Sequence, residues 1–404
     1  MRSFESPQLS AVRSFAYNLV MTRASTYHAA RAVAATIEAH FAEHRDEARA
    51  RGESGLAQIP SAQVIEKMID ATFWASFRPE EGRFPKISLS FVPPEQARQP
   101  LVFEERLPLN TATLTKLAPA VERPGIHLGV WHERVGAEEE LYIWGATRKV
   151  PSLGFVLEDI EPGLLVIKHR RAAGFGKFAN VAVLKGEQVK IIDELGQSLP
   201  DCPDLLTSLH AFTAREQYLP EVNALVQLAA SMRAHGQGGT LLVVPDGSER
   251  WRDSIVHPIL YSVVPPFARL ANLIIQGAAR AGENEWEAAL RSVVDAVAGL
   301  TAVDGATLIS STYEVLAFGA KIRRATGREP VEQMMLTEPI MGNQAEVAHP
   351  VLHGGTRHLS AAQFVYDQRD SLALVASQDG RFTVFAWSPC EQMVHAHRVD
   401  VLLM

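Results

Sequence analysis

The sequence predicts a mixed α/β protein in two parts: an N-terminal α+β region, then a C-terminal mixed sheet flanked by helices. Apolar residues alternate with period two in short segments across residues 126–193, which favours a small antiparallel sheet or barrel. The run 239–244 (GTLLVV) is continuously apolar, as expected for a strand buried on both faces. Pro200 and Pro203 separate these two patterns, so we place the parts at residues 1–210 and 211–404.

Bulk composition limits the class of protein. A chain of 404 residues is too long for one ordinary core, and 47% hydrophobic with 21% charged residues is typical of soluble globular proteins. The formal charge of -7 disfavours sequence-independent binding of DNA or RNA. Two cysteines cannot form a disulfide framework, and no run reaches the ~18 apolar residues of a membrane span. We therefore expect a cytoplasmic protein without a membrane partner.

The N-terminal part should begin with helices between residues 9 and 77. Residues 9–50 carry apolar side chains at helical spacing, and residues 61–77 form a second such pattern. Residues 86–92 alternate like a strand between prolines. The candidate strands of the sheet that follows are 126–131, 140–146, 154–158, 164–169, 180–184 and 188–192.

The C-terminal part alternates helices and strands. Pro220 suits a first helical turn, and Gly236 suits the end of that helix. Asp379-Gly380 is a strong hairpin dipeptide, and a loop should run through Pro339 and Pro350. The expected elements are helices 220–235, 267–280, 284–299 and one opening at Thr356, with strands 239–244, 306–310, 314–322, 371–377 and 381–387.

Two short motifs, about fifty residues apart, carry the groups needed to hold a phosphate ester. Residues 354–358 read Gly-Gly-Thr-Arg-His at the start of a predicted helix. Thr356 could cap that helix, whose free N–H groups and partial positive charge favour an anion. Arg357 can hold two phosphate oxygens, and His358 could bind a metal or donate to phosphate.

The other motif is Asp-Gly-Ala at residues 304–306, directly before a predicted strand. Asp304 would be a hard oxygen ligand for Mg²⁺ or Mn²⁺ bridging to phosphate, with His358 completing the metal site. Gly305 would leave space beside the ligand. The competing interpretation is structural, because Asp-Gly is a common turn and Gly-Gly-Thr-Arg could be an ordinary loop before a helix.

With these motifs in place, residues 220–388 resemble the diadenylate cyclase (DAC) domain family, whose members join two ATP molecules into cyclic di-AMP. The resemblance rests on the helix leading into GTLLVVP, on DGATLI, on GTRHLSAA and on the closing strands LALVASQDGRFTVF. It implies an ATP-like or cyclic dinucleotide ligand, a divalent metal and, in active members, face-to-face pairing of two domains, hence a homo-oligomer. The site residues it implies are Asp304, Gly305, Ala306, Gly355, Thr356, Arg357 and His358.

Two departures from the family pattern bear on activity. Leu359 stands where the family has a second arginine, and Gln378-Asp379 replaces an acidic pair. Losing a cation from a phosphate clamp weakens catalysis more than binding, since the remaining groups can still hold the ligand. We therefore expect a DAC-like nucleotide sensor. The alternatives are a working diadenylate cyclase, with Asp304, Arg357 and His358 catalytic, and a structural interaction module whose pocket is vestigial.

Overall fold

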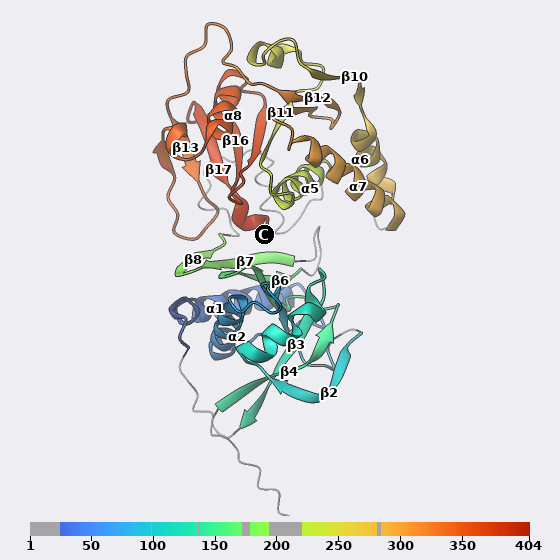
Figure 1. The fold of residues 1–404 in the computed structure, drawn as a ribbon, viewed down its shortest axis with the longest axis vertical. Coiled ribbons are helices and arrows are strands. Elements are labelled where there is room, and N and C mark those ends of the chain that lie inside the picture. Colours follow the sequence, from blue (N-terminus) through green and yellow to red (C-terminus); the bar gives the residue numbers. More distant parts are fainter. Residues whose placement is uncertain (1–24, 98, 136–137, 172–177, 194–219, 281–283) are drawn as a thin grey trace, which may run out of the picture.

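The computed structural model describes residues 25–97, 99–135, 138–171, 178–193, 220–280 and 284–404. They form two mixed sheets, each with helices packed against it (Figure 1). This confirms the predicted fold class. The predicted boundary near residue 210 and the first residues of the predicted helix 9–50 lie outside the described residues.

In the described residues, the first sheet has eight strands in the order β2-β4-β3-β1-β5-β6-β7-β8. The strands are β1 (Ser88–Phe91), β2 (Leu101–Pro108), β3 (His127–Val135), β4 (Glu138–Thr147), β5 (Phe155–Glu161), β6 (Leu164–Arg170), β7 (Phe178–Lys185) and β8 (Gln188–Ile191). The sequence predicts a purely antiparallel sheet, and that prediction is wrong at one pair of strands. β1 runs parallel to β3, although it pairs antiparallel with β5.

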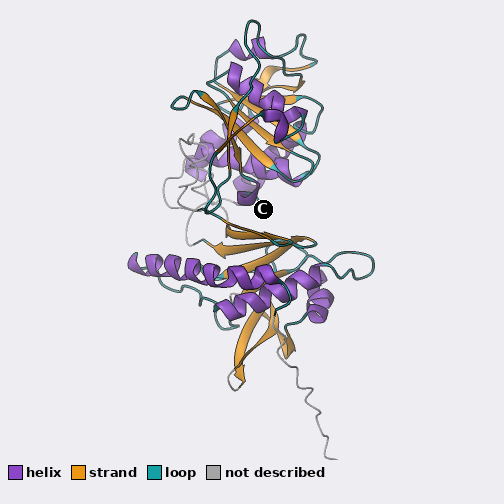
Figure 2. Cartoon of the chain, turned by 90° about the vertical axis from the view of Figure 1, so that its left-hand side faces the viewer, coloured by secondary structure: helices purple, strands orange, loops and turns teal. Residues whose placement is uncertain are grey.

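The helices α1 (His28–Ala50) and α2 (Ala62–Ser76) cover one face of this sheet and lie side by side in Figure 2. The Ser61 side chain caps α2 by accepting from the Val64 N–H at 3.3 Å. The apolar stripes of both helices meet in one core with the inward residues of the strands, which is where most of their stability arises. The short helices α3 (Thr111–Leu117) and η1 (Ala118–Val121) close the end of this core.

The second sheet has nine strands among the described residues, in the order β10-β12-β11-β9-β15-β16-β17-β13-β14. They are β9 (Gly239–Val244), β10 (Tyr261–Phe267), β11 (Ala306–Ser310), β12 (Val315–Ala320), β13 (Met334–Thr337), β14 (Glu346–Ala348), β15 (Leu372–Ala376), β16 (Phe382–Ser388) and β17 (Met393–Arg398). The central strand β9 is buried along its whole length, as its apolar sequence predicts.

Helices cover both faces of the second sheet. One apolar core joins a face to α5 (Pro220–Ala234), α6 (Arg269–Arg280) and α7 (Asn284–Leu300). A separate core joins the other face to α8 (Thr356–Asp367). Short 3-10 turns complete the described chain at η2 (Arg250–Ser254), η3 (Pro350–Leu352) and η4 (Asp400–Leu402).

Five strands were not predicted from the sequence: β2, β10, β13, β14 and β17. Most residues of β2 are exposed, and β10 contains Pro265 and Pro266. Proline is tolerated in β10 because that strand lies at the edge of the sheet. The predicted loop through Pro339 and Pro350 is partly wrong, because β13 precedes it and β14 lies within it. β17 is the fifth strand that was not predicted.

The two parts meet where β8 approaches the segment that follows β13. Ile192 forms an isolated antiparallel bridge with Ile340, and the Met341 N–H donates to the Ile191 carbonyl at 2.9 Å. A small apolar core, including Val183 and Val401, contains residues of both parts. The Asn180 side chain also donates to the Val401 carbonyl at 2.8 Å, so β7 holds the last turn of the chain. Figure 1 shows β7 and β8 facing this end of the second sheet.

None of the helices in the described part of the chain combines the length and the apolar character needed to cross a lipid bilayer.

Candidate functional site

Strand register brings the two sequence motifs to one edge of the second sheet. Ala306 at the start of β11 pairs with Thr240 of β9 and with Ala320 of β12. Gly239 of β9 pairs with Ala376 at the end of β15. The residues just beyond these pairs therefore emerge together at the same edge, and they include Gly238, Asp304, Lys321 and Gln378.

Asp304 is the most exposed acidic group at this edge for which an ion pair is resolved. Its side chain is 91% accessible, and its Oδ2 lies 2.5 Å from the Lys321 Nζ. The hydrogen bond and charge of Lys321 lower the pKa of Asp304, and the positive charge of Arg357 adds to that effect. The carboxylate is therefore ionised at neutral pH and is paired with Lys321.

Close packing explains the glycine that follows Asp304. Gly305 has φ +121°, and a Cβ there would lie 2.5 Å from the carbonyl carbon of Gly319. The side-chain position is thus taken up by the backbone of β12, rather than by the space for a ligand that the sequence suggested. This contact brings the start of β11 against the end of β12, which sets Asp304 beside Lys321.

The start of α8 differs from the prediction in its cap. Gly355 is the N-cap residue, and no side chain caps the helix, so Thr356 is the first helical residue rather than the cap. Gly355, Thr356 and Arg357 are all exposed, and a Cβ on Gly355 would meet no atom within 4 Å. The first N–H groups of α8 are therefore open to an approaching anion.

Arg357 lies over the loop that leads into β9. A Cβ built on Gly238 would lie 3.2 Å from the Arg357 Nη1 and 3.3 Å from the Gln378 Cγ. Gln378 in turn donates from Nε2 to the Gln237 carbonyl at 3.3 Å. The helix start, the hairpin after β15 and the entry to β9 thus converge. Because Thr240 pairs with Ala306, Gly238 lies level with Asp304, and the positive charge of Arg357 lowers the pKa of that carboxyl.

His358 has a different environment from Asp304. It is 7% exposed, its Nε2 lies 3.3 Å from the Thr383 Oγ1, and a Cβ on Gly354 would lie 2.3 Å from its Cγ. Burial lowers the pKa of His358, and the charges of Arg398, Arg381 and Arg357 lower it further, against an opposing effect of Asp379. The ring is therefore neutral at pH 7 and packed between α8 and β16.

Within the described residues, no group of three His, Cys, Asp or Glu side chains is arranged to hold a metal ion. Of the predicted site residues, Asp304 is the one with the hard, exposed oxygen donors that Mg²⁺ or Mn²⁺ prefers. Magnesium is commonly held by one carboxylate, water and the phosphates of its ligand, so Asp304 fits that role. The buried contacts of His358 give it no comparable opening to solvent.

Sequence reasoning missed three cations near these motifs: Lys321, Arg381 and Arg398. Lys321 follows β12, Arg381 precedes β16 and Arg398 ends β17, so strand register was needed to bring them to the same edge. Together with Arg357 they are the cations that act on Asp304 or His358, and Asp379 is the one further carboxylate among those described groups. Lys321 and Arg357 together carry one positive charge more than Asp304, in a chain of formal charge -7.

The position that the DAC resemblance assigns to a second arginine is apolar in structure as well as sequence. Leu359 is partly buried against the core between α8 and the sheet. It therefore stabilises packing and leaves no cation at that place in the helix.

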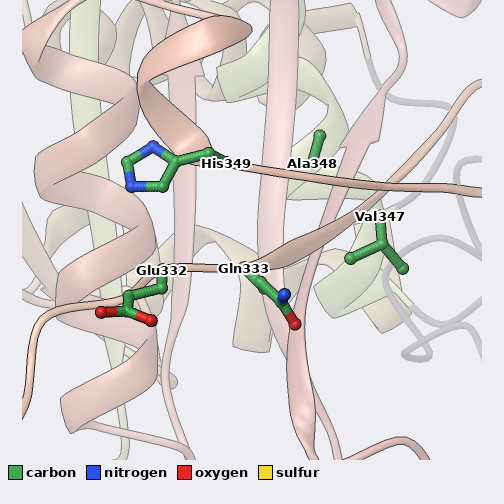
Figure 3. Close-up of a pocket in the computed structure, with 5 residues that line it drawn as sticks. All are labelled: Glu332, Gln333, Val347, Ala348 and His349. Atoms are coloured by element: carbon green, nitrogen blue, oxygen red, sulfur yellow. The ribbon is translucent and has the colours of Figure 1, made fainter.

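A separate shallow hollow lies at the other end of β13, away from this edge. Figure 3 shows its lining residues, Glu332, Gln333, Val347, Ala348 and His349. The His349 Nδ1 already accepts from the Val351 N–H at 3.2 Å, as part of the η3 cap. This hollow shares no residue with the motifs.

Comparison with known proteins gives one family match and no curated relative. Residues 54–148 match the family model described as "Probable sensor domain DACNV". The curated proteins yield no match to the chain. The matched stretch contains α2 and strands β1 to β4, while the sheet continues through β5 to β8. The N-terminal part of this chain is thus similar, over residues 54–148, to a probable sensor domain.

Proposed function

We propose that this chain is a nucleotide sensor whose C-terminal part binds the phosphates of ATP or a cyclic dinucleotide at the edge that carries Asp304 and Arg357. The observation that carries the proposal is that Lys321 pairs with the exposed Asp304 carboxylate while Arg357 lies beside Gly238, which strand register sets level with Asp304. A cluster with surplus positive charge beside an open helix start suits a phosphate group.

Each group has a role in this proposal. The guanidinium of Arg357 and the N–H groups at Thr356 hold phosphate oxygens, and Gly355 lets the ligand approach the backbone. Asp304 holds Mg²⁺ or Mn²⁺, which neutralises phosphate charge when bound. His358, neutral and packed against Thr383, keeps the first turn of α8 in place.

The sensor role is supported by the family match and by the junction between the two parts. Arg398, whose positive charge lowers the pKa of His358, ends β17 and is separated from η4 by Val399 alone. Asn180 of β7 holds η4 through the Val401 carbonyl, at 2.8 Å. Ligand binding at this edge would therefore be transmitted through few contacts to the sheet that contains part of the matched sensor domain.

The test is calorimetric titration of the full chain with ATP and with cyclic di-AMP, with and without Mg²⁺. Arg357→Gln should weaken binding by about tenfold or more, because a charge-assisted contact to phosphate is lost. Arg324→Gln is the matched control, since Arg324 is exposed and acts on Asp367 rather than on Asp304. No binding of any of these ligands at millimolar concentration would end the proposal.

Incubation with ATP and Mn²⁺ separates a sensor from a working diadenylate cyclase. The sensor predicts that ATP binds and stays intact. Cyclic di-AMP that forms with the unmodified chain but not with Asp304→Asn would instead favour the enzyme. If Arg357→Gln changes neither ligand binding nor any product, the pocket is vestigial.

A further inference from the structure

The backbone of Lys321 is fixed on both sides while its side chain remains free to move. The Lys321 carbonyl accepts from the Val256 N–H at 2.8 Å, and Ile322 bridges to Ile255. On the other side, Ala320 pairs with Ala306. The side chain itself is 54% exposed. The ammonium group can therefore swing over a few ångströms from an anchored Cα.

In the free protein, this ammonium is held by Asp304 rather than by a buried acceptor. The Nζ–Oδ2 distance is 2.5 Å, and the carboxylate is 91% exposed. An exposed ion pair of this kind contributes little to folding, so it can be opened at low cost. Arg357 acts on the same carboxylate, which leaves one positive charge in excess at this point.

We propose that Lys321 is a phosphate-binding residue of this site, stored on Asp304 in the free protein and transferred to phosphate when the ligand binds. The proposal rests on the nucleotide-binding function proposed above and names a cation for it outside both sequence motifs. A phosphate group that arrives at Arg357 lies near Lys321, because the Arg357 Nη1 is 3.2 Å from the Cβ position of Gly238, the pairing of Thr240 with Ala306 sets Gly238 level with Asp304, and Asp304 holds Lys321.

With a divalent cation present, Asp304 would be the carboxylate that holds it, and the Lys321 ammonium would then be released to a phosphate oxygen. Without a divalent cation, Asp304 competes with phosphate for Lys321. Asp304 therefore favours binding when the metal is present and opposes it when the metal is absent.

The experiment measures ATP affinity of the full chain, with Mn²⁺ and with EDTA, for a set of variants. With Mn²⁺, Lys321→Met should weaken binding about tenfold to a hundredfold, whereas Lys321→Arg should retain most of it. The matched control Arg324→Met, which removes an exposed positive charge three residues further on, should stay within about twofold. Circular dichroism and the midpoint of thermal unfolding check that each variant is folded.

A double-mutant cycle in EDTA tests the exchange itself. Asp304→Asn should strengthen metal-free ATP binding several-fold, because Lys321 is released, and this gain should shrink in the Lys321→Met background. A gain of the same size in both backgrounds overturns the storage of Lys321 on Asp304. Lys321→Met that binds ATP as tightly as Arg324→Met overturns its role as a phosphate ligand.

The outcomes also separate this inference from the function on which it rests. If the unmodified chain binds no nucleotide, both fail. If it binds ATP, and Arg357→Gln weakens binding while Lys321→Met does not, only the role of Lys321 fails.

Discussion

Lys190, near the end of the last strand of the first sheet, forms an ion pair with Glu338, which directly follows β13 of the second sheet. Both side chains are largely buried, at 29% and 12% accessibility. The same region contains Asp400, whose pKa is raised chiefly by burial, with Lys190 opposing and Glu338 reinforcing the shift. The junction between the parts is therefore a charged contact close to the candidate site.

Lys190→Met should lower the free energy of unfolding by about 1–2 kcal/mol, because Glu338 would keep its burial and lose its cation. Arg250→Met is the control, since its 3.5 Å pair with Asp370 is exposed on both sides, at 71% and 44%, and should contribute at most about 0.5 kcal/mol. Urea unfolding of both variants measures the difference. Equal losses would mean that the junction pair is no stronger than a surface pair.

Gly305→Ala should be much more costly than Gly355→Ala. At Gly305, φ is +121° and the new Cβ would meet the Gly319 backbone at 2.5 Å, so about 2–4 kcal/mol of stability should be lost. At Gly355 the space is open, and the loss should not exceed about 1 kcal/mol. Thermal and urea unfolding compare the two. The Gly355 variant should still bind ATP less tightly, because the added methyl group restricts the approach of phosphate to the backbone.

His127 should make the first sheet sensitive to acid. Burial lowers the pKa of His127 to about 4 from 6.5, with Glu158 opposing the shift and Lys168 adding to it. A folded pKa below the unfolded one means that the full stability is present above pH 6.5 and is lost as the pH falls towards 4. The loss should reach about 3 kcal/mol. Unfolding between pH 7 and pH 4.5 should depend less on pH in His127→Gln, and an unchanged slope would contradict the assignment.

Asp159 should show the opposite pH dependence. Burial, reinforced by Glu161, raises its pKa from 3.8 to about 7. Its extra stability is present below pH 3.8 and is lost as the pH rises through 7, because ionisation is then favoured in the unfolded chain. Asp159→Asn should therefore be more stable than the unmodified protein at pH 8, by about 2 kcal/mol, and similar to it at pH 4. A variant that is less stable at pH 8 would show that the charged form is stabilised in the fold.

Sequence patterns located the elements that bury one continuous face. The predicted helix 61–77 is observed as α2, and the predicted strand 306–310 is β11 without change. The sequence patterns did not predict the edge strands β2 and β10. β2 is mostly exposed and β10 contains prolines, so neither carries an alternating apolar pattern. An alternating apolar pattern marks a strand with one buried face, and an edge strand can form with little burial.

The sequence alone was sufficient to determine the mixed α/β class and the central apolar strand β9, because both are encoded in neighbouring residues, and it contains the acid, glycine and arginine motifs. Tertiary structure decided which groups stand together. Lys321 and Asp304 are seventeen positions apart and meet only because β11 and β12 pair antiparallel. The tertiary structure also buries His358 in a core and leaves Asp304 exposed to solvent. Charge and burial depend on register between strands, and register is a property of the whole sheet.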